Sequence, residues 1–327
     1  MSHLIFLAHT PEMRRNYYGE KALAGLRALG PVRLHEGDEA LHGPALVAAA
    51  QGARIIVADR MTPGPAEVFA GLPDLAAFVR VAVDIRDVDV EGASAAGVLV
   101  TRAGPGFTES VAELVLGLMI DLSRGVSRSV RAYQEGRMPV REMGRQLSSS
   151  TLGIIGFGTI GRYLAPLGLA LGMKVLVADP HATVTDASLR QTTMEDMLAE
   201  ADYVVCLAVA TPETENLMDA SAFARMKPGA FFVNVSRGNL VDEAALEAAL
   251  REGRIGGVGL DVGRAPDQMP SPHIAALPNV VATPHIGGLT PPAIAFQALG
   301  TVGQVEAILK GEVPPGAVNA QHWTRRL

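Results

Sequence analysis

The sequence predicts an α/β protein with two domains. Short apolar runs of strand length alternate with stretches of helical periodicity along most of the chain, which is typical of parallel sheets covered by helices. With 327 residues, the chain is long enough to form two hydrophobic cores. In its middle, a glycine-rich turn at 156–161 joins an apolar run to a helical stretch. We therefore expect one of the two domains to form around this turn.

The first 100 residues or so predict a small parallel sheet covered by helices. Apolar runs with β character occur at 4–8, 54–58, 78–83 and 98–101, and the helical stretches between them include 20–29 and 44–50. No phosphate-binding fingerprint occurs in this part, so we do not expect the cofactor site there.

A break and then a long helix follow. The segment 103–108 (AGPGFT) interrupts the alternation, and helical periodicity then extends over 108–134. Ser110 and Glu113 have the spacing of a capping box. The helix presents a broad apolar face, which needs a partner. The rest of the chain and a second subunit would satisfy this need equally well.

The most informative stretch is residues 151–179, TLGIIGFGTIGRYLAPLGLALGMKVLVAD. Strand, tight turn, helix and strand follow one another here, as the dinucleotide-binding fingerprint requires. Gly156 makes the turn, Gly158 lets the backbone approach a pyrophosphate, and Gly161 lets the helix lie close to the sheet. The N-terminus of the helix presents N–H groups to the phosphates. Because a carboxylate accepts from both ribose hydroxyls and repels a 2′-phosphate, Asp179 favours NAD over NADP.

Alternating helices and strands continue to the end of the chain. Inside the fingerprint helix, Pro166 costs roughly 3 kcal/mol unless a kink accommodates it. After Asp179 we expect helices at 194–200, 220–226, 243–251 (capped by Asp242) and 291–310, and strands at 203–208, 230–235, 257–262 and 280–283. The last helix opens at Pro291 and is ended by Gly311. We expect it to carry the chain back to the first domain.

Composition argues against several classes of protein. The formal net charge of −6 provides no basic surface for nucleic acid. The single cysteine, Cys206, cannot form an intrachain disulfide, so we expect a reducing cytoplasm. The N-terminal apolar run lacks a basic flank and is too short for a signal sequence, and the longest apolar helix, 111–122, carries Glu113 and Asp121. We therefore expect neither nucleic acid nor a membrane as a partner, and no metal site is predicted.

Three side chains with useful chemistry follow predicted strands downstream of the fingerprint. They are Arg237, Asp261 and His285. In a doubly wound sheet, ligands bind outside the carboxyl ends of the strands. Arg237 can grip a carboxylate or carbonyl with its planar fork of donors, and His285 can exchange a proton near neutral pH. Each could be structural by itself, but together they predict a site where a substrate lies beside a nicotinamide.

The chain resembles the D-isomer-specific 2-hydroxyacid dehydrogenase family over nearly its full length. The motifs that carry the resemblance are GPGFTESVAE at 104–113, GFGTIG at 156–161 followed by Asp179, TPET at 211–214, NVSRG at 234–238, LDV at 260–262 and TPHIGG at 283–288. The resemblance implies a Rossmann-type, doubly wound NAD domain at 103–291. This domain would be inserted into a smaller, flavodoxin-like α/β substrate domain formed by 1–102 and 292–327. It also implies a homodimer, usually formed through the long helix.

The resemblance implies roles for single residues as well. Arg237 would bind the substrate and polarise its carbonyl, His285 would donate the proton, and Asp261 would contact the nicotinamide carboxamide. The positions that would lie along the NAD cofactor are Thr159, Ile160 and Thr214.

One departure from the family concerns the partner of His285. In the family, a glutamate five residues after the LDV aspartate orients the histidine and favours its charged form. Pro266 stands at that position here and can do neither. We expect Asp267, the nearest acid, to take over this role after a small shift of the loop.

A second departure lies in the substrate loop. The family's Gly-Val-Gly, whose backbone N–H groups hold the substrate carboxylate, corresponds to Ala82-Val83-Asp84. Asp84 would repel a carboxylate unless it points away or pairs with Arg80 or Arg86.

The function we predict is NAD-dependent interconversion of a small 2-keto acid and its D-2-hydroxy acid. Arg237 would anchor the substrate, His285 would exchange the proton, and Asp267 would replace the missing glutamate. Two alternatives are a non-catalytic NAD(H)-binding sensor or scaffold, and a dehydrogenase for a non-carboxylate substrate if Asp84 faces the pocket.

Overall fold

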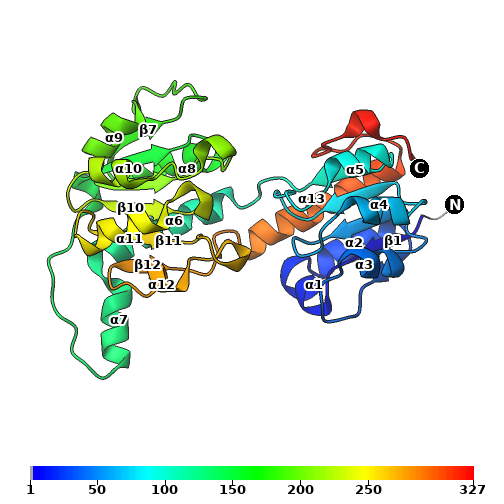
Figure 1. The fold of residues 1–327 in the computed structure, drawn as a ribbon, viewed down its shortest axis with the longest axis horizontal. Coiled ribbons are helices and arrows are strands. Elements are labelled where there is room, and N and C mark those ends of the chain that lie inside the picture. Colours follow the sequence, from blue (N-terminus) through cyan, green and yellow to red (C-terminus); the bar gives the residue numbers. More distant parts are fainter. Residues whose placement is uncertain (1–2) are drawn as a thin grey trace. The chain divides into compact units, whose positions relative to one another are not determined.

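The computed structural model describes residues 3–327 and divides into two compact units (Figure 1). One unit combines the chain up to Gly106 with Thr290–Leu327, and the other is Phe107–Leu289. The first unit is therefore built from both ends of the chain, and the last long helix, α13 (Pro291–Leu309), belongs to it.

The first unit contains a parallel sheet of five strands in the order β2-β1-β3-β4-β5. Its strands are β1 (Ile5–Leu7), β2 (Val32–Leu34), β3 (Ile55–Ala58), β4 (Ala77–Arg80) and β5 (Leu99–Arg102). Its other helices are α1 (Pro11–Tyr17), α2 (Glu20–Leu29), α3 (Gly43–Ala49), α4 (Ala66–Gly71) and α5 (Val90–Ala95). This is the flavodoxin-like strand order. Each of the four predicted apolar runs forms a strand, and β2 is an additional short strand that its pattern did not reveal.

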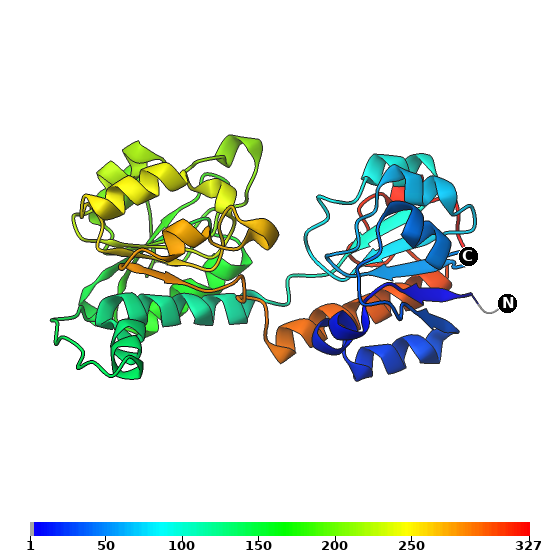
Figure 2. The same ribbon diagram turned by 60° about the horizontal axis from the view of Figure 1, so that its bottom comes forward.

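Helices cover both faces of this first sheet. Helices α2 and α13 pack on one face, in a cluster that includes Leu26 and Val305. Helices α3, α4 and α5 pack on the other face, where Leu46 and Phe69 are fully buried. Figure 2 shows α13, in orange, on one side of the strands and α5, in cyan, on the other.

The second unit contains a parallel sheet of seven strands in the order β12-β11-β10-β9-β6-β7-β8. The strands are β6 (Thr151–Ile155), β7 (Lys174–Ala178), β8 (Arg190–Gln191), β9 (Tyr203–Cys206), β10 (Phe231–Asn234), β11 (Gly257–Leu260) and β12 (Val280–Ala282). The helices are α6 (Thr108–Arg124), α7 (Val126–Gln134), α8 (Thr159–Ala170), α9 (Met194–Glu200), α10 (Ala220–Arg225), α11 (Glu243–Arg251) and α12 (Pro272–Ala275). The sheet starts at β6 in its middle and grows outward in both directions, which is the doubly wound Rossmann order.

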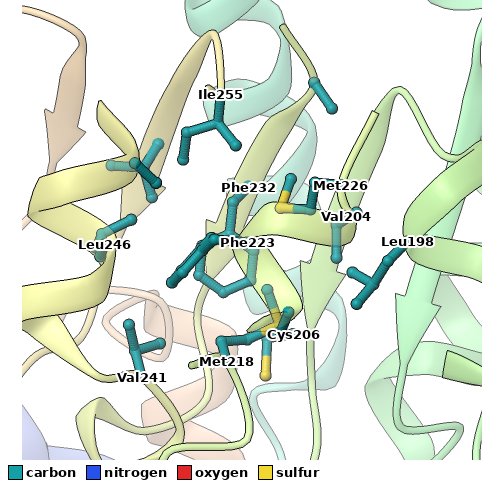
Figure 3. Packing of buried hydrophobic residues seen from close by; sticks show 14 of the residues in the cluster. Leu198, Val204, Cys206, Met218, Phe223, Met226, Phe232, Val241, Leu246 and Ile255 are labelled. Carbon is teal, nitrogen blue, oxygen red and sulfur yellow. The ribbon is translucent and has the colours of Figure 1, made fainter. Parts of the chain in front are cut away.

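Neighbouring residues in the central strands of the second sheet point to opposite faces. Phe232 of β10 joins the cluster formed with α9, α10, α11 and α12, whereas the next residue, Val233, joins the cluster formed with α6 and α8. In the first cluster, the rings of Phe223 and Phe232 meet edge to face with centroids 5.6 Å apart (Figure 3). Burial of each such side chain contributes about 1.5–3 kcal/mol, so this packing holds the helices on the sheet.

The prediction of one long helix over 108–134 is wrong. Gly125 adopts a left-handed conformation (φ 61°), which ends α6 and begins α7. Glycine reaches this conformation without a Cβ penalty, so one residue breaks a helix that the apolar periodicity alone would continue. The predicted capping box of Ser110 and Glu113 is also wrong, because the helix begins earlier with Phe107 as its N-cap.

Other predicted helix features hold. Helix α8 continues through Pro166, which lies on its exposed face. Asp242 caps α11 by accepting hydrogen bonds from the N–H groups of Ala244 and Ala245. Across residues 3–327, no helix combines the length and the apolar character that a membrane span needs.

Candidate functional site

The fingerprint turn between β6 and α8 has a geometry that requires glycine. Gly156 has a φ of 92°, and a Cβ there would lie 2.7 Å from the backbone nitrogen of Ala208. A Cβ on Gly161 would lie 2.5 Å from the carbonyl oxygen of Gly156. At Gly158, by contrast, an added Cβ would meet nothing within 4 Å. The N-terminus of α8 therefore has open space in front of it, which fits the pyrophosphate of a dinucleotide.

Asp179 directly follows β7 and contacts that turn. Its Oδ2 accepts a hydrogen bond from the N–H of Phe157 at 2.6 Å, and its Oδ1 accepts one from the N–H of His181 at 2.7 Å. Partial burial alone would raise the pKa of Asp179, but these backbone hydrogen bonds outweigh burial and lower the pKa. The group is a carboxylate at neutral pH, and its remaining lone pairs can accept from ribose hydroxyls.

The other predicted cofactor residues lie near the same edge of the sheet. Thr159 and Ile160 are the first two residues of α8. Thr214 ends the 3-10 turn η2 (Pro212–Thr214), where its hydroxyl accepts from the N–H of Thr211 and donates to the carbonyl of Val209, both at 2.8 Å. Since β9, which precedes this turn, pairs with β6, the turn follows the strand next to the fingerprint.

Arg237, Asp261 and His285 follow three neighbouring strands. Strands β10, β11 and β12 lie side by side and run parallel, so the segments after them emerge at one edge of the sheet. The fingerprint turn follows β6 at this same carboxyl edge. In the second unit, the segments that carry these three residues therefore lie at the edge where doubly wound sheets bind ligands.

Asp261 is buried and ties down the turn that carries His285. Its Oδ1 accepts from the hydroxyl of Thr283 at 2.6 Å and from the N–H of Ile286 at 2.8 Å. Its Oδ2 accepts from the N–H of Gly287 at 2.8 Å. Asp261 has an exposed fraction of 2%, so a buried carboxylate holds the turn 283–287 in place.

His285 meets Asp267, but through the backbone. The Nδ1 atom of His285 lies 2.7 Å from the main-chain carbonyl oxygen of Asp267. Because a carbonyl oxygen can only accept, Nδ1 carries the hydrogen and Nε2 is the ring nitrogen able to exchange a proton with another molecule. The sequence pointed to the carboxylate of Asp267, whereas the contact with His285 in the structure uses its carbonyl. Pro266 begins the 3-10 turn η4 (Pro266–Gln268) that presents this carbonyl.

Arg237 lies in a turn stiffened by its neighbours. The side-chain amide of Asn234 donates to the carbonyl of Arg237 at 2.8 Å and accepts from the N–H of Ser236 at 3.0 Å. The guanidinium of Arg237 donates to the carbonyl of Ser236 at 2.7 Å. The side chain of Arg237 is half-buried.

The first unit contains the predicted substrate residues Val83 and Asp84. Asp84 pairs with Arg86, whose Nε and Nη2 reach the carboxylate at 3.0 and 2.7 Å. The hydrogen bond with Asp84 raises the pKa of Arg86. Of the two arginines considered from the sequence, Arg86 is therefore the one whose side chain pairs with the Asp84 carboxylate.

Arg80 organises this loop in a way that the sequence did not reveal. Its side chain is 2% exposed, and Nη1 donates to the carbonyls of Asp59 and Thr62 at 2.6 and 2.7 Å. Its Nη2 binds the Asp87 carboxylate at 2.7 Å. An arginine at the end of a buried apolar run was the available signal, because such a charge needs many partners.

Arg264 was also missed. Its Nη2 donates to Glu215 at 2.8 Å and to the carbonyl of Val241 at 3.0 Å, and so joins the segment after η2 to the segment after β11. Among residues 3–327, no cluster of three or more histidine, cysteine or carboxylate side chains could hold a metal ion.

Comparison with known proteins identifies relatives. The family model described as "D-isomer specific 2-hydroxyacid dehydrogenase, NAD binding domain" matches residues 116–287. A D-3-phosphoglycerate dehydrogenase of Mycobacterium leprae is 36% identical over 84% of this chain and 52% of its own length. An (S)-sulfolactate dehydrogenase of Chromohalobacter salexigens is 35% identical over 75% of this chain and 81% of its own. The chain thus spans about half the length of the phosphoglycerate dehydrogenase that it matches.

A solved structure agrees with these matches. The TT0316 protein from Thermus thermophilus superposes with a TM-score of 0.86 and 32% identity, covering 96% of this chain and 99% of that one. The glycine turn, Asp179 and the doubly wound sheet lie in or next to the matched NAD-binding segment. The chain belongs to the D-isomer-specific 2-hydroxyacid dehydrogenases, a family of NAD-dependent oxidoreductases.

Proposed function

We propose that this protein interconverts a small 2-keto acid and its D-2-hydroxy acid with NAD as the cofactor. The observation that carries the proposal is the hydrogen bond that makes Nδ1 of His285 a donor, at the sheet edge that also bears Arg237 and the glycine turn. Two relatives are named for 3-phosphoglycerate and sulfolactate, which are both small 2-hydroxy acids. These names support the substrate class without selecting one member.

His285 serves as the proton-exchanging group in this proposal. During reduction, Nε2 of the protonated ring donates to the ketone oxygen, and during oxidation the neutral Nε2 accepts the hydroxyl proton. When bound, the nicotinamide supplies or accepts the hydride. Asp261 keeps the imidazole in place by holding the turn at Ile286 and Gly287. This support matters because a small displacement of a general acid strongly reduces the rate of the reaction that it catalyses.

Arg237 anchors the substrate in this proposal. Its guanidinium can bind a carboxylate or polarise a ketone oxygen with paired donors. For the first unit, we assign the substrate residues to Val83 and Asp84. The pairing of Asp84 with Arg86 supports an acid as substrate, because it compensates the negative charge that would otherwise repel one. It also favours a carboxylate over the alternative of a non-carboxylate substrate.

The cofactor residues follow from the same geometry. Gly156, Gly158 and Gly161 let the pyrophosphate approach α8, and Asp179 accepts from the ribose. We assign the remaining contacts along the cofactor to Thr159, Ile160, Thr214 and Asp261. Because Asp179 is ionised, we expect NADH to bind more tightly than NADPH.

The test is NADH oxidation by the purified protein with a panel of small 2-keto acids, followed by chiral analysis of the product. We expect turnover with at least one acid and a D product. His285→Gln should lose at least a hundredfold in kcat, since a general acid contributes about 10²–10⁴-fold. His273→Gln, which changes an exposed histidine of the same unit, is the matched control. Turnover that survives in His285→Gln would remove this residue from the mechanism, and binding of NADH without any turnover would favour a sensor.

We also propose a homodimer in which the segment 120–143 forms the contact. Large apolar side chains are exposed there, including Met138 at 78%, Val140 at 80% and Met143 at 100%. A second copy would remove this surface from water. Sedimentation should show a dimer that Val140→Glu combined with Met143→Glu dissociates, and a monomeric wild-type protein would contradict this. We assign substrate binding to the first unit and NAD binding to the second.

A further inference from the structure

Three left-handed residues meet at the contact between His285 and the loop after β11. The φ angles are 57° at Asp267, 60° at Gln268 and 55° at His285. Within residues 3–327, the only other non-glycine residue with positive φ is Asn216, at 53°. Left-handed backbone is disfavoured for residues with a Cβ, and it persists only where surrounding contacts impose it. Its concentration on both sides of one hydrogen bond indicates that the backbone is shaped for that bond.

The loop 263–269 is closed by its own hydrogen bonds. The N–H of Gly263 donates to the carbonyl of Gln268 at 2.8 Å, and the N–H of Ala265 donates to that of Met269 at 3.0 Å. A Cβ on Gly238 would lie 2.1 Å from the carbonyl oxygen of Gly263, so the backbone after Arg237 packs directly on the start of the loop. The loop therefore touches the Arg237 turn at one end and His285 at the other.

A side chain inside the loop anchors it to the rest of the unit. Arg264 donates to the carbonyl of Val241 at 3.0 Å and to the Glu215 carboxylate at 2.8 Å. The N–H of Arg264 also donates to Glu243 at 3.3 Å. These bonds oppose relaxation of the loop, and so can sustain the left-handed conformation at its tip.

We propose that Asp267 is a positioning residue that orients His285 through its main-chain carbonyl, and that the left-handed tip of the loop 263–269 replaces a side-chain carboxylate in this role. The proposal rests on the proposed role of His285. A carbonyl fixes the tautomer and the direction of the ring, but it brings no full negative charge. Aspartate and asparagine tolerate the left-handed conformation better than most residues, so the residue type at 267 suits this backbone.

Substitutions of Asp267 separate the backbone from the carboxylate. Asp267→Asn and Asp267→Gly remove the charge but keep the carbonyl and tolerate positive φ. Asp267→Val also keeps the carbonyl, but its β-branched side chain resists positive φ. We expect kcat to be about tenfold or more lower in the Val variant than in the Asn and Gly variants, which keep the left-handed backbone. NADH affinity should be unchanged in all three variants. If Asp267→Val does not fold, Asp267→Ala makes the same comparison with less backbone strain.

Two further measurements distinguish orientation from general stability. The pH profile of kcat in Asp267→Asn should coincide with that of the wild type, because this variant keeps the main-chain carbonyl that contacts the ring. Long-range ¹H–¹⁵N spectra of the histidine rings should show Nδ1–H on His285 in the wild type and Asp267→Asn, and a tautomer mixture in Asp267→Val. The His285 signals are assigned by their loss in His285→Gln.

Equal loss of kcat in the Asn, Gly and Val variants, or a shifted pH profile in Asp267→Asn, would show that the carboxylate acts and would overturn the proposal. Unchanged kcat and tautomer in Asp267→Val would overturn it as well. If the wild type turns over no hydroxy acid, the proposed function fails, while the spectra still decide whether the carbonyl orients the ring.

Discussion

Acid should destabilise the first unit through His9, which follows β1. The ring of His9 is completely buried against Tyr18, with centroids 5.0 Å apart, and neither ring nitrogen has a hydrogen-bond partner among the described residues. Burial lowers the pKa of His9 to about 4, and Arg14 and Arg80 add to this while Asp59 opposes it. The folded protein therefore keeps this imidazole neutral.

Proton linkage gives the sign and size of the change in unfolding free energy. The folded-state pKa of about 4 lies below the ordinary value of 6.5, so as pH falls the unfolded chain binds the proton first. The contribution of neutral His9 to the unfolding free energy is fully present above the ordinary pKa of 6.5. It is lost as the pH falls from that value to the folded-state pKa. At 1.36 kcal/mol per unit, the loss is about 2 kcal/mol at about pH 5 and about 3 kcal/mol once the pH is below the folded-state value.

The assay is denaturant unfolding followed by fluorescence of Trp323, the only tryptophan, which is buried in the first unit. Between about pH 7.5 and about pH 5, His9→Phe should gain about 2 kcal/mol in unfolding free energy relative to the wild type. Carboxylates titrate in both proteins, so their effects cancel in the difference. His273→Gln, an exposed histidine of the other unit, should show no such gain. An equal difference between His9→Phe and wild type at both pH values would refute the linkage.

Three other predictions follow from individual contacts. Gly161→Ala, whose Cβ would lie 2.5 Å from the Gly156 carbonyl, should lower stability by about 1–3 kcal/mol in thermal unfolding. Gly158→Ala should leave stability unchanged while weakening NADH binding. Equal unfolding temperatures for the two variants would contradict this. Cys206, whose thiol pKa burial raises to about 12, should react with thiol reagents only after denaturation, so labelling of the native protein would count against its burial. Arg86→Ala should raise KM for an acid substrate on the order of tenfold, because it removes a positive charge that compensates Asp84, and adding Asp84→Asn should restore KM. A KM that does not change in Arg86→Ala would separate Asp84 from the substrate site.

Local patterns were sufficient for much of the fold. Strands β1, β3, β4 and β5 largely coincide with apolar runs, because a strand buried on both faces is mostly apolar. The glycine turn was equally readable, since positive φ at Gly156 and the close approach at Gly161 exclude other residues. Asp242 was identifiable as a cap because capping involves only the next turn of helix. Strand β2 escaped because it is short and only partly buried.

The sequence by itself determined the family motifs, the doubly wound NAD-binding unit and the candidate residues Arg237, Asp261 and His285. Each depends on residue types at short spacing, where backbone geometry limits the alternatives. Only the tertiary structure decided that Asp267 meets His285 through a carbonyl and that Asp84 pairs with Arg86. The first depends on backbone angles in a loop distant in sequence from the histidine. The second depends on which of the two nearby arginines already has other partners. Arg80 donates to two carbonyls and to the Asp87 carboxylate, which leaves Arg86 to pair with Asp84.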